Sequence, residues 1–116
     1  MNPGLRAVIA NIAARLAGQN VNSAVYDHTQ GKHIHVSGNI SATSVAIYDH
    51  DRNDHISGTH TNLYDHNLNA HLSLNMNGSH FTGYDYGSGF HYSGHINCHL
   101  VTIFDNENNQ HHQYTV

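Results

Sequence analysis

The chain is poor in the residues that stabilise small disulfide-bonded or cysteine-zinc domains. Its 116 residues include one cysteine, Cys98, one proline and no tryptophan. A single cysteine excludes an intramolecular disulfide, a Cys-X-X-Cys motif and a zinc site built from several cysteines. Because net charge is small and aromatic residues recur, the low hydropathy does not indicate disorder. We expect one folded domain covering residues 1–116.

Strong positive charge is also scarce. Lysine and arginine together number four, and the formal net charge is −4. Binding to a phosphate backbone requires a clustered basic face, so we expect no nucleic-acid partner. No apolar run approaches the ~20 residues of a membrane span, so no transmembrane segment is expected. Arg15 interrupts the only N-terminal apolar stretch, so no Sec signal peptide is evident and a cytoplasmic location is the default expectation.

What the chain does have is a pattern that returns five times. Each copy contains an aromatic residue, an aspartate, five variable positions and a histidine. The aromatic residues are 22, 16, 20 and 20 positions apart, a spacing typical of repeat architectures. The copies are Tyr26-Asp27 with His33, Tyr48-Asp49 with His55, Tyr64-Asp65 with His71, Tyr84-Asp85 with His91, and Phe104-Asp105 with His111.

Each copy predicts a β-hairpin. Alternating apolar and polar residues, as in 44–48, precede the aromatic residue, and turn-forming residues follow the aspartate. Residues 23–116 therefore predict five hairpin repeats with about ten antiparallel strands. A meander of that size must curl into a barrel, fold into a sandwich or stack as a solenoid to bury its apolar face.

Strand alternation assigns each hairpin two faces. In the predicted register, the residue two positions after each aromatic opposes the motif histidine, which pairs His28 with His33, His50 with His55 and His66 with His71 on the tyrosine face. The opposite, core face carries Val25, Ile34, Val36, Val45, Ile47, Ile56, Leu63, Leu72, Leu74, Phe81, Tyr92, Val101, Ile103 and Tyr114. The motif aspartates fall on the core side at the hairpin end, where we expect them to accept hydrogen bonds from turn amides as structural turn clamps. These are Asp27, Asp49, Asp65, Asp85 and Asp105.

The N-terminal segment predicts an amphipathic helix over residues 3–17. Asn2 and Pro3 provide a start signal, and Gly18 provides a stop. Apolar residues from 5 to 16 recur at helical spacing, with the polar residues off that stripe. We expect the helix to pack on the sheet, although one helix should not cover ten strands alone. The alternatives are a helix on a membrane surface and a helix that contacts another subunit. The fold class is thus α+β, mostly antiparallel β.

Histidine is the residue type with the clearest chemistry. Opposed imidazoles in a hairpin would be close enough to share Zn²⁺, Cu²⁺ or Ni²⁺. A structural zinc site normally has four ligands, so we expect no required cofactor, with zinc, copper or nickel as weakly bound candidates. The candidate ligands are His28, His33, His35, His50, His55, His66 and His71.

The repetition favours a non-enzymatic role. Catalysis needs one site with asymmetric neighbours, and no copy contains a distinct nucleophile or a phosphate-binding loop. The leading hypothesis is a self-associating structural module, an oligomer or filament subunit, because a sheet with an uncovered face or edge can bury it against copies of itself. The alternative is a histidine-rich metal-binding protein. A third hypothesis is a multivalent module with a glycan partner, since rings stack on sugars and polar side chains bind hydroxyls.

Overall fold

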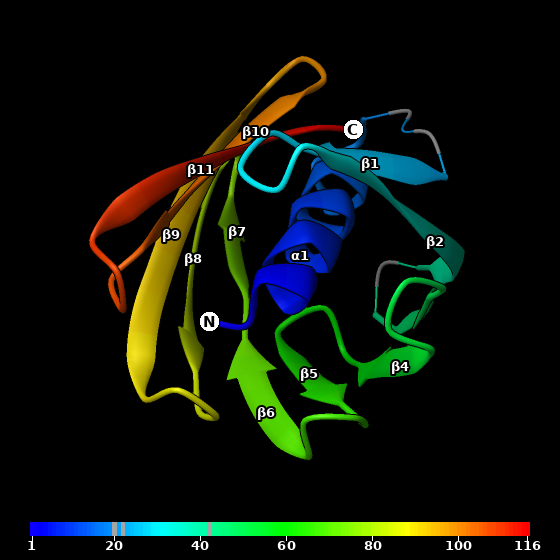
Figure 1. The fold of residues 1–116 in the computed structure, drawn as a ribbon. Helices are drawn as coiled ribbons and strands as arrows, with labels where there is room; N and C mark the ends of the chain where they lie inside the picture. Colours follow the sequence, from blue (N-terminus) through cyan, green and yellow to red (C-terminus); the bar gives the residue numbers. More distant parts are fainter. Residues whose placement is uncertain (20, 22, 42) are drawn as a thin grey trace.

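The computed structural model describes residues 1–19, 21, 23–41 and 43–116, and shows antiparallel strands wrapped around one helix (Figure 1). The helix α1 spans Pro3–Leu16. The described strands are β1 (Ala24–Asp27), β2 (Lys32–Ile40), β3 (Val45–Asp49), β4 (Asp54–Gly58), β5 (Asn62–Asp65), β6 (Ala70–Ser73), β7 (Asn75–Asn77), β8 (His80–Asp85), β9 (Phe90–Asn97), β10 (Leu100–Asp105) and β11 (Gln110–Thr115). The protein is therefore α+β and mostly antiparallel β, as the sequence predicts.

The sheet closes on itself. Strands that follow one another pair as hairpins, and β1 pairs with β11, which joins the first and last repeats. At the other end of the strand order β6 pairs with β8, where Leu72 opposes Asp85. Only Leu74 separates β6 from β7, and both pair with β8, so these two segments act as one bent strand. The result is a closed barrel of ten strands, the first of the three architectures named above.

The helix lies inside the barrel (Figure 1). All its residues from Gly4 to Ala14 are buried, including Arg6 and Asn11. The expectation that the helix packs on the sheet is confirmed, since α1 contacts β1, β2 and β10. The expected exposed polar face is wrong, and so is the expectation that one helix cannot cover ten strands alone. A closed barrel surrounds a helix on every side, so every face of α1 between Gly4 and Ala14 is covered. No face of the helix between Gly4 and Ala14 is therefore exposed to a membrane surface or to another subunit.

Local sequence signals set the ends of α1. The Asn2 side chain accepts hydrogen bonds from Gly4 N and Leu5 N, as expected of an N-cap. Gly18 has a φ of +87°, in the left-handed region where glycine carries no Cβ penalty. Among the described residues no helix is long and apolar enough to cross a membrane.

The predicted core face is confirmed. All fourteen apolar and aromatic residues assigned to it are at most 2% exposed. They pack against the enclosed helix, whose Leu5, Ile9 and Ile12 are fully buried. Two-residue alternation is therefore a reliable guide to which side of each strand faces inward in this chain.

The predicted register is wrong by two residues. The motif aromatics themselves oppose the motif histidines, as in Tyr26 with His33 and Tyr48 with His55. His28 and its counterparts lie instead in four-residue turns. The aspartate carboxylate binds amides two and three residues ahead, which folds these residues into the turn. A shift of two residues keeps every side chain on its face, so the core assignment survives the error.

Candidate functional site

The five motif aspartates lie at the hairpin ends of the strands, around the start of α1. We call them the aspartate ring, and each is at most 4% exposed. In every copy the Oδ1 atom accepts a hydrogen bond from the amide two residues ahead, at 2.8–3.0 Å. The carboxylates thus contact turn amides, while their effect on stability stays a prediction.

Arginine side chains neutralise part of the ring from inside. Arg52 donates through Nε to Asp49 Oδ2 at 2.7 Å and through Nη1 to Asp65 Oδ2 at 3.0 Å. Arg6, on the helix, donates to Asp105 Oδ2 at 2.9 Å and to Tyr114 Oη at 2.7 Å. Arg52 thus joins its own hairpin to the next one, whereas Arg6 joins the helix to the last hairpin.

One further acid joins the Arg52 group. Asp54 lies 3.3 Å from Arg52 Nη1 and next to Asp65. Burial, hydrogen bonding and repulsion with Asp65 raise the pKa of Asp54 to about 6. Burial opposes ionisation of Asp65, but hydrogen bonds from Asp54, Leu68 N and Arg52 outweigh it and lower the pKa of Asp65. One guanidinium therefore serves three carboxyl groups, and a proton on Asp54 relieves their repulsion.

The outer face of the barrel carries a different arrangement. Each motif aromatic ring lies against its opposed motif histidine, with ring centroids 4.7–4.8 Å apart. In the first four copies the residue two positions ahead contacts the other side of the ring, at 4.8–4.9 Å. The predicted pairs of His28 with His33, His50 with His55 and His66 with His71 are therefore separated by a tyrosine. We call these stacks, with their neighbours on the same face, the outer histidine–aromatic surface.

Several of the outer histidines form hydrogen bonds with serine or threonine hydroxyl groups. The Nε2 atoms of His28, His50 and His66 each lie 2.8 Å from a serine or threonine oxygen on an adjacent strand. The partners are Thr115, Ser37 and Ser57 respectively. These hydrogen bonds engage one nitrogen of each ring, and a tyrosine lies between the two histidines of each predicted pair. Both features disfavour the binding of one metal ion by the two histidines of a pair.

The seven predicted metal ligands are distributed over the first three hairpins. They lie on the exposed outer side of the hairpins. Across the described residues, no group of three or more histidine, cysteine, aspartate or glutamate side chains is arranged to hold a metal ion.

One histidine pair that the sequence analysis missed does occur. His80 on β8 opposes His95 on β9, with ring centroids 6.0 Å apart. Both lie beside an outer hollow of about 220 Å³ that Phe104 and His111 also line. In the observed register Tyr84 opposes His91, so the residue four positions before Tyr84 opposes the residue four positions after His91. These residues are His80 and His95, so the correct register would have predicted the pair.

One histidine points inward. His112 is 3% exposed, with Nδ1 2.9 Å from Thr29 Oγ1 and Nε2 3.1 Å from Asn108 Nδ2. Burial and the nearby Arg6 charge lower the pKa of His112, while Asp105 and Asp27 oppose the shift. The inner and outer histidines of this chain thus have different environments, which the residue count alone does not reveal.

Comparison of the chain with protein-family models, with curated protein sequences and with solved structures gives no significant match. Arguments about function therefore rest on the geometry of the two surfaces. The outer surface offers repeated rings, imidazoles and hydroxyls, whereas most of the aspartate ring is already engaged inside the barrel.

Proposed function

We propose that the chain is a non-enzymatic module that associates with copies of itself through the outer histidine–aromatic surface. The observation that carries the proposal is the low charge of that surface. Arg6 and the aspartate ring are buried in the barrel end, and Arg52 is mostly covered there, which leaves few charged groups outside, such as the pair Lys32–Asp51. Protein interfaces favour aromatic residues and avoid lysine, glutamate and aspartate.

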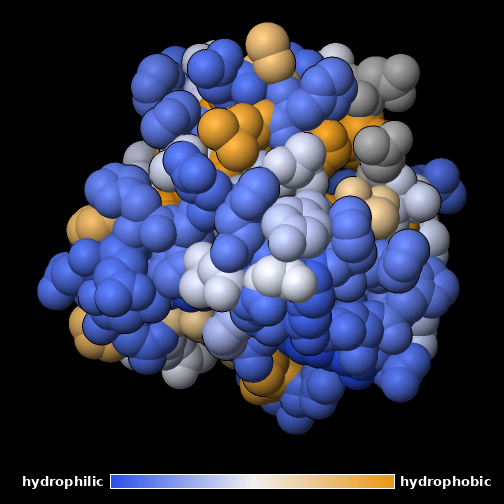
Figure 2. Space-filling view, turned by 45° about the horizontal axis from the view of Figure 1, so that its top comes forward, coloured by the Kyte–Doolittle hydropathy of each residue, from blue (hydrophilic) through white to orange (hydrophobic). Residues whose placement is uncertain are grey.

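Association of this kind would be lateral. The expectation from sequence rested on an uncovered sheet face or edge, but closure pairs β1 with β11 and β6 with β8, and α1 fills the interior. Contact between copies must therefore use outward side chains rather than added strands. Figure 2 shows a view of the surface on which hydrophilic residues predominate and apolar ones are scattered.

Tyr86 is the best anchor on this surface. It is 64% exposed, its ring meets the Tyr84 ring edge-on with centroids 4.8 Å apart, and it lines a hollow with His71 and Asn62 across the β6–β8 junction. An exposed tyrosine beside a hollow is typical of residues that dominate binding energy. We therefore place the centre of the contact here.

Sedimentation velocity over a concentration series tests the proposal. We expect wild-type protein to associate with chelator present, and Tyr86→Ser to weaken association by about tenfold or more. Phe90→Ser is the matched control, because Phe90 is 42% exposed but lies on the core side of its strand, opposite Asp85. A wild-type protein that stays monomeric up to its solubility limit would refute self-association.

The second candidate is metal binding, and the His80–His95 pair favours it. Two imidazoles with centroids 6.0 Å apart could contribute two ligands to Zn²⁺, Cu²⁺ or Ni²⁺. A pair on a second copy would complete four ligands, so metal would then promote association. Particles that dissociate with chelator and fail to form in His80→Gln, but form in His60→Gln, would support this candidate over the first.

Glycan binding stays a prediction. Because the aspartate ring faces inward, a sugar on the outer surface would contact imidazoles, rings and hydroxyls instead.

A further inference from the structure

Four of the five carboxylates in the aspartate ring receive a side-chain or amine donor at Oδ2. Asp27 receives Gln30 Nε2 at 2.9 Å, and Asp49 and Asp65 receive Arg52. Asp105 receives Arg6 and also lies 3.2 Å from the Met1 amine. These donors show how the fold satisfies a carboxylate in this position.

Asp85 is the exception. It is 4% exposed, yet its side chain accepts one hydrogen bond, from Gly87 N to Oδ1 at 3.0 Å. Within the described residues it has no ion-pair partner. A buried carboxylate is normally paired or fully hydrogen-bonded, because burial without compensation costs several kcal/mol or more. The second oxygen of Asp85 therefore lacks the donor that its four counterparts have.

Asp27 and Asp49 receive their donor from the residue three positions ahead, whereas Asp65 and Asp105 receive theirs from elsewhere in the chain. The position three residues ahead holds Gln30 in the first hairpin and Arg52 in the second, and both reach back to their own aspartate. In the fourth hairpin it holds Ser88, whose side chain is too short to replace them. The Ser88 Oγ atom is buried with no hydrogen-bonding partner. The fourth hairpin thus combines a buried Ser88 hydroxyl without a partner and an Asp85 Oδ2 atom that receives no side-chain donor.

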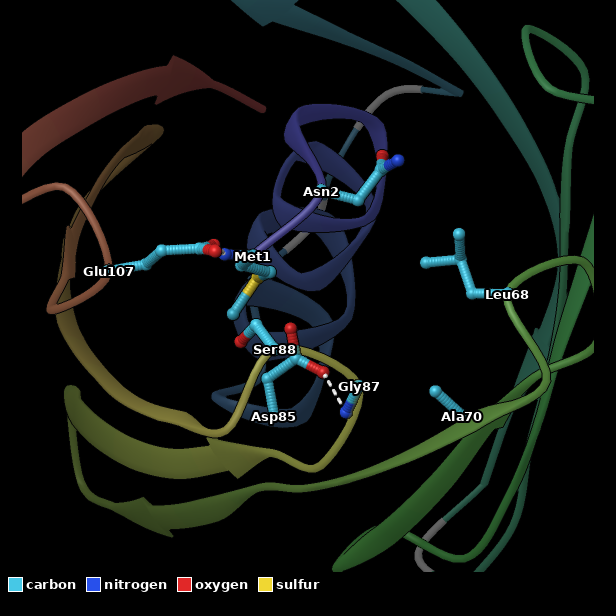
Figure 3. Close-up of a pocket in the computed structure, with 8 residues that line it drawn as sticks. All are labelled: Met1, Asn2, Leu68, Ala70, Asp85, Gly87, Ser88 and Glu107. Carbon is cyan, nitrogen blue, oxygen red and sulfur yellow. Dashed lines mark hydrogen bonds and ion pairs between the residues drawn. The ribbon is translucent and has the colours of Figure 1, made fainter.

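A cavity of about 350 Å³ adjoins both groups (Figure 3). Met1, Leu68 and Ala70 give it apolar walls. Leu68 is 40% exposed and the Glu107 side chain is 44% exposed, so the cavity is accessible from solvent at this rim. Glu107 already pairs with the Met1 amine, which leaves Asp85 as the uncompensated charge.

We propose that this cavity binds a guanidinium group, which enters from solvent and donates to Asp85 Oδ2 and Ser88 Oγ. The planar fork of a guanidinium presents several N–H donors at once and pairs strongly with carboxylates. Three of the four satisfied counterparts, Asp49, Asp65 and Asp105, already use a guanidinium from Arg52 or Arg6. The described residues here form no three-ligand metal group, which favours an organic cation. The source is a free small guanidine or the arginine side chain of a protein partner.

Titration of ¹⁵N-labelled protein followed by NMR tests the proposal. The probes are N-ethylguanidinium, its neutral analogue N-ethylurea and a capped Gly-Arg-Gly peptide. We expect saturable shifts at the Gly87, Ser88 and Gly89 amides with at least one guanidinium probe and none with the urea. Asp85→Asn, which keeps an acceptor for Gly87 N, should weaken binding by about tenfold or more. Asp51→Asn, which removes an acid outside the cavity, should not.

A second variant keeps the test decisive if Asp85→Asn perturbs folding. Ser88→Arg places a guanidinium at the position that Arg52 occupies in the second hairpin, so it should abolish probe binding and raise the melting temperature. Tighter binding of N-ethylguanidinium indicates a free small ligand, and tighter binding of the peptide indicates an arginine from a partner. No saturable shift with either probe, equal binding of the urea, or undiminished binding by Asp85→Asn would overturn the proposal.

Discussion

The aspartate and the histidine of each repeat recur with equal regularity, yet they lie in opposite environments. The five aspartates face the barrel interior and are at most 4% exposed, whereas the five motif histidines lie on the outer surface. Inside, each carboxylate must find donors within a closed space. Outside, each imidazole can exchange a protein contact for water at little cost. Regular spacing in a sequence therefore does not tell how much stability a residue provides.

The largest expected effect comes from removing the interior cation that serves three acids. Arg52→Ala leaves Asp49, Asp54 and Asp65 without it, so we expect a loss of about 3–5 kcal/mol in the free energy of unfolding. Urea denaturation at neutral pH measures the loss. Lys32→Ala breaks an exposed pair with Asp51 and should cost at most about 1 kcal/mol. Equal losses of stability in the two variants would show that the ion pairs of Arg52 stabilise the protein no more than the exposed pair Lys32–Asp51 does.

A smaller effect, with a defined pH dependence, is expected at Asp54. Its folded pKa of about 6 lies above the unfolded value of about 3.9, so the folded state binds more protons between these values. Its contribution to stability is therefore fully present below about pH 4 and is lost as pH rises through about 6. Asp54→Asn, which keeps an acceptor for Asn67 N, should be about 1–2 kcal/mol more stable than wild type at pH 7.5.

Urea denaturation between about pH 4 and pH 7.5 checks this difference, which should shrink toward the acid end. Asp51→Asn is the control, since the Asp51 side chain is 35% exposed. A variant that is less stable than wild type at pH 7.5 would show that Asp54 is needed as a charged partner of Arg52.

The smallest effect is expected on the outer surface. His55→Gln removes an imidazole stacked on Tyr48 and should change the free energy of unfolding by less than about 0.5 kcal/mol. His112→Gln disturbs hydrogen bonds to Thr29 and Asn108 in the interior and should cost about 1–2 kcal/mol. Urea denaturation at pH 8 compares the two. A His55 variant as unstable as the His112 variant would mean that the outer stacks support the fold.

Some features of this molecule were predictable because they depend on neighbours within one hairpin. The alternation around Ile47 predicts its burial, and Asn2 with Pro3 predicts the helix start. The register failed at the turns, because each four-residue turn begins directly after the aspartate and not one residue later. That error produced the histidine pairs as metal candidates and concealed the pair His80–His95.

The sequence by itself determined the hairpins, their inner and outer faces and the helix ends, because these follow from periodicity and capping over short stretches. Only the tertiary structure decided that the sheet closes, that α1 lies inside it, and that Arg6 on the helix joins an acid of the last repeat. Arg6 and Asp105, for example, are 99 residues apart in the chain. Such contacts depend on which hairpins meet when the barrel closes, and closure is a property of all the repeats together. For the same reason, the donor missing at Asp85 becomes apparent only when the five hairpins are seen around one interior.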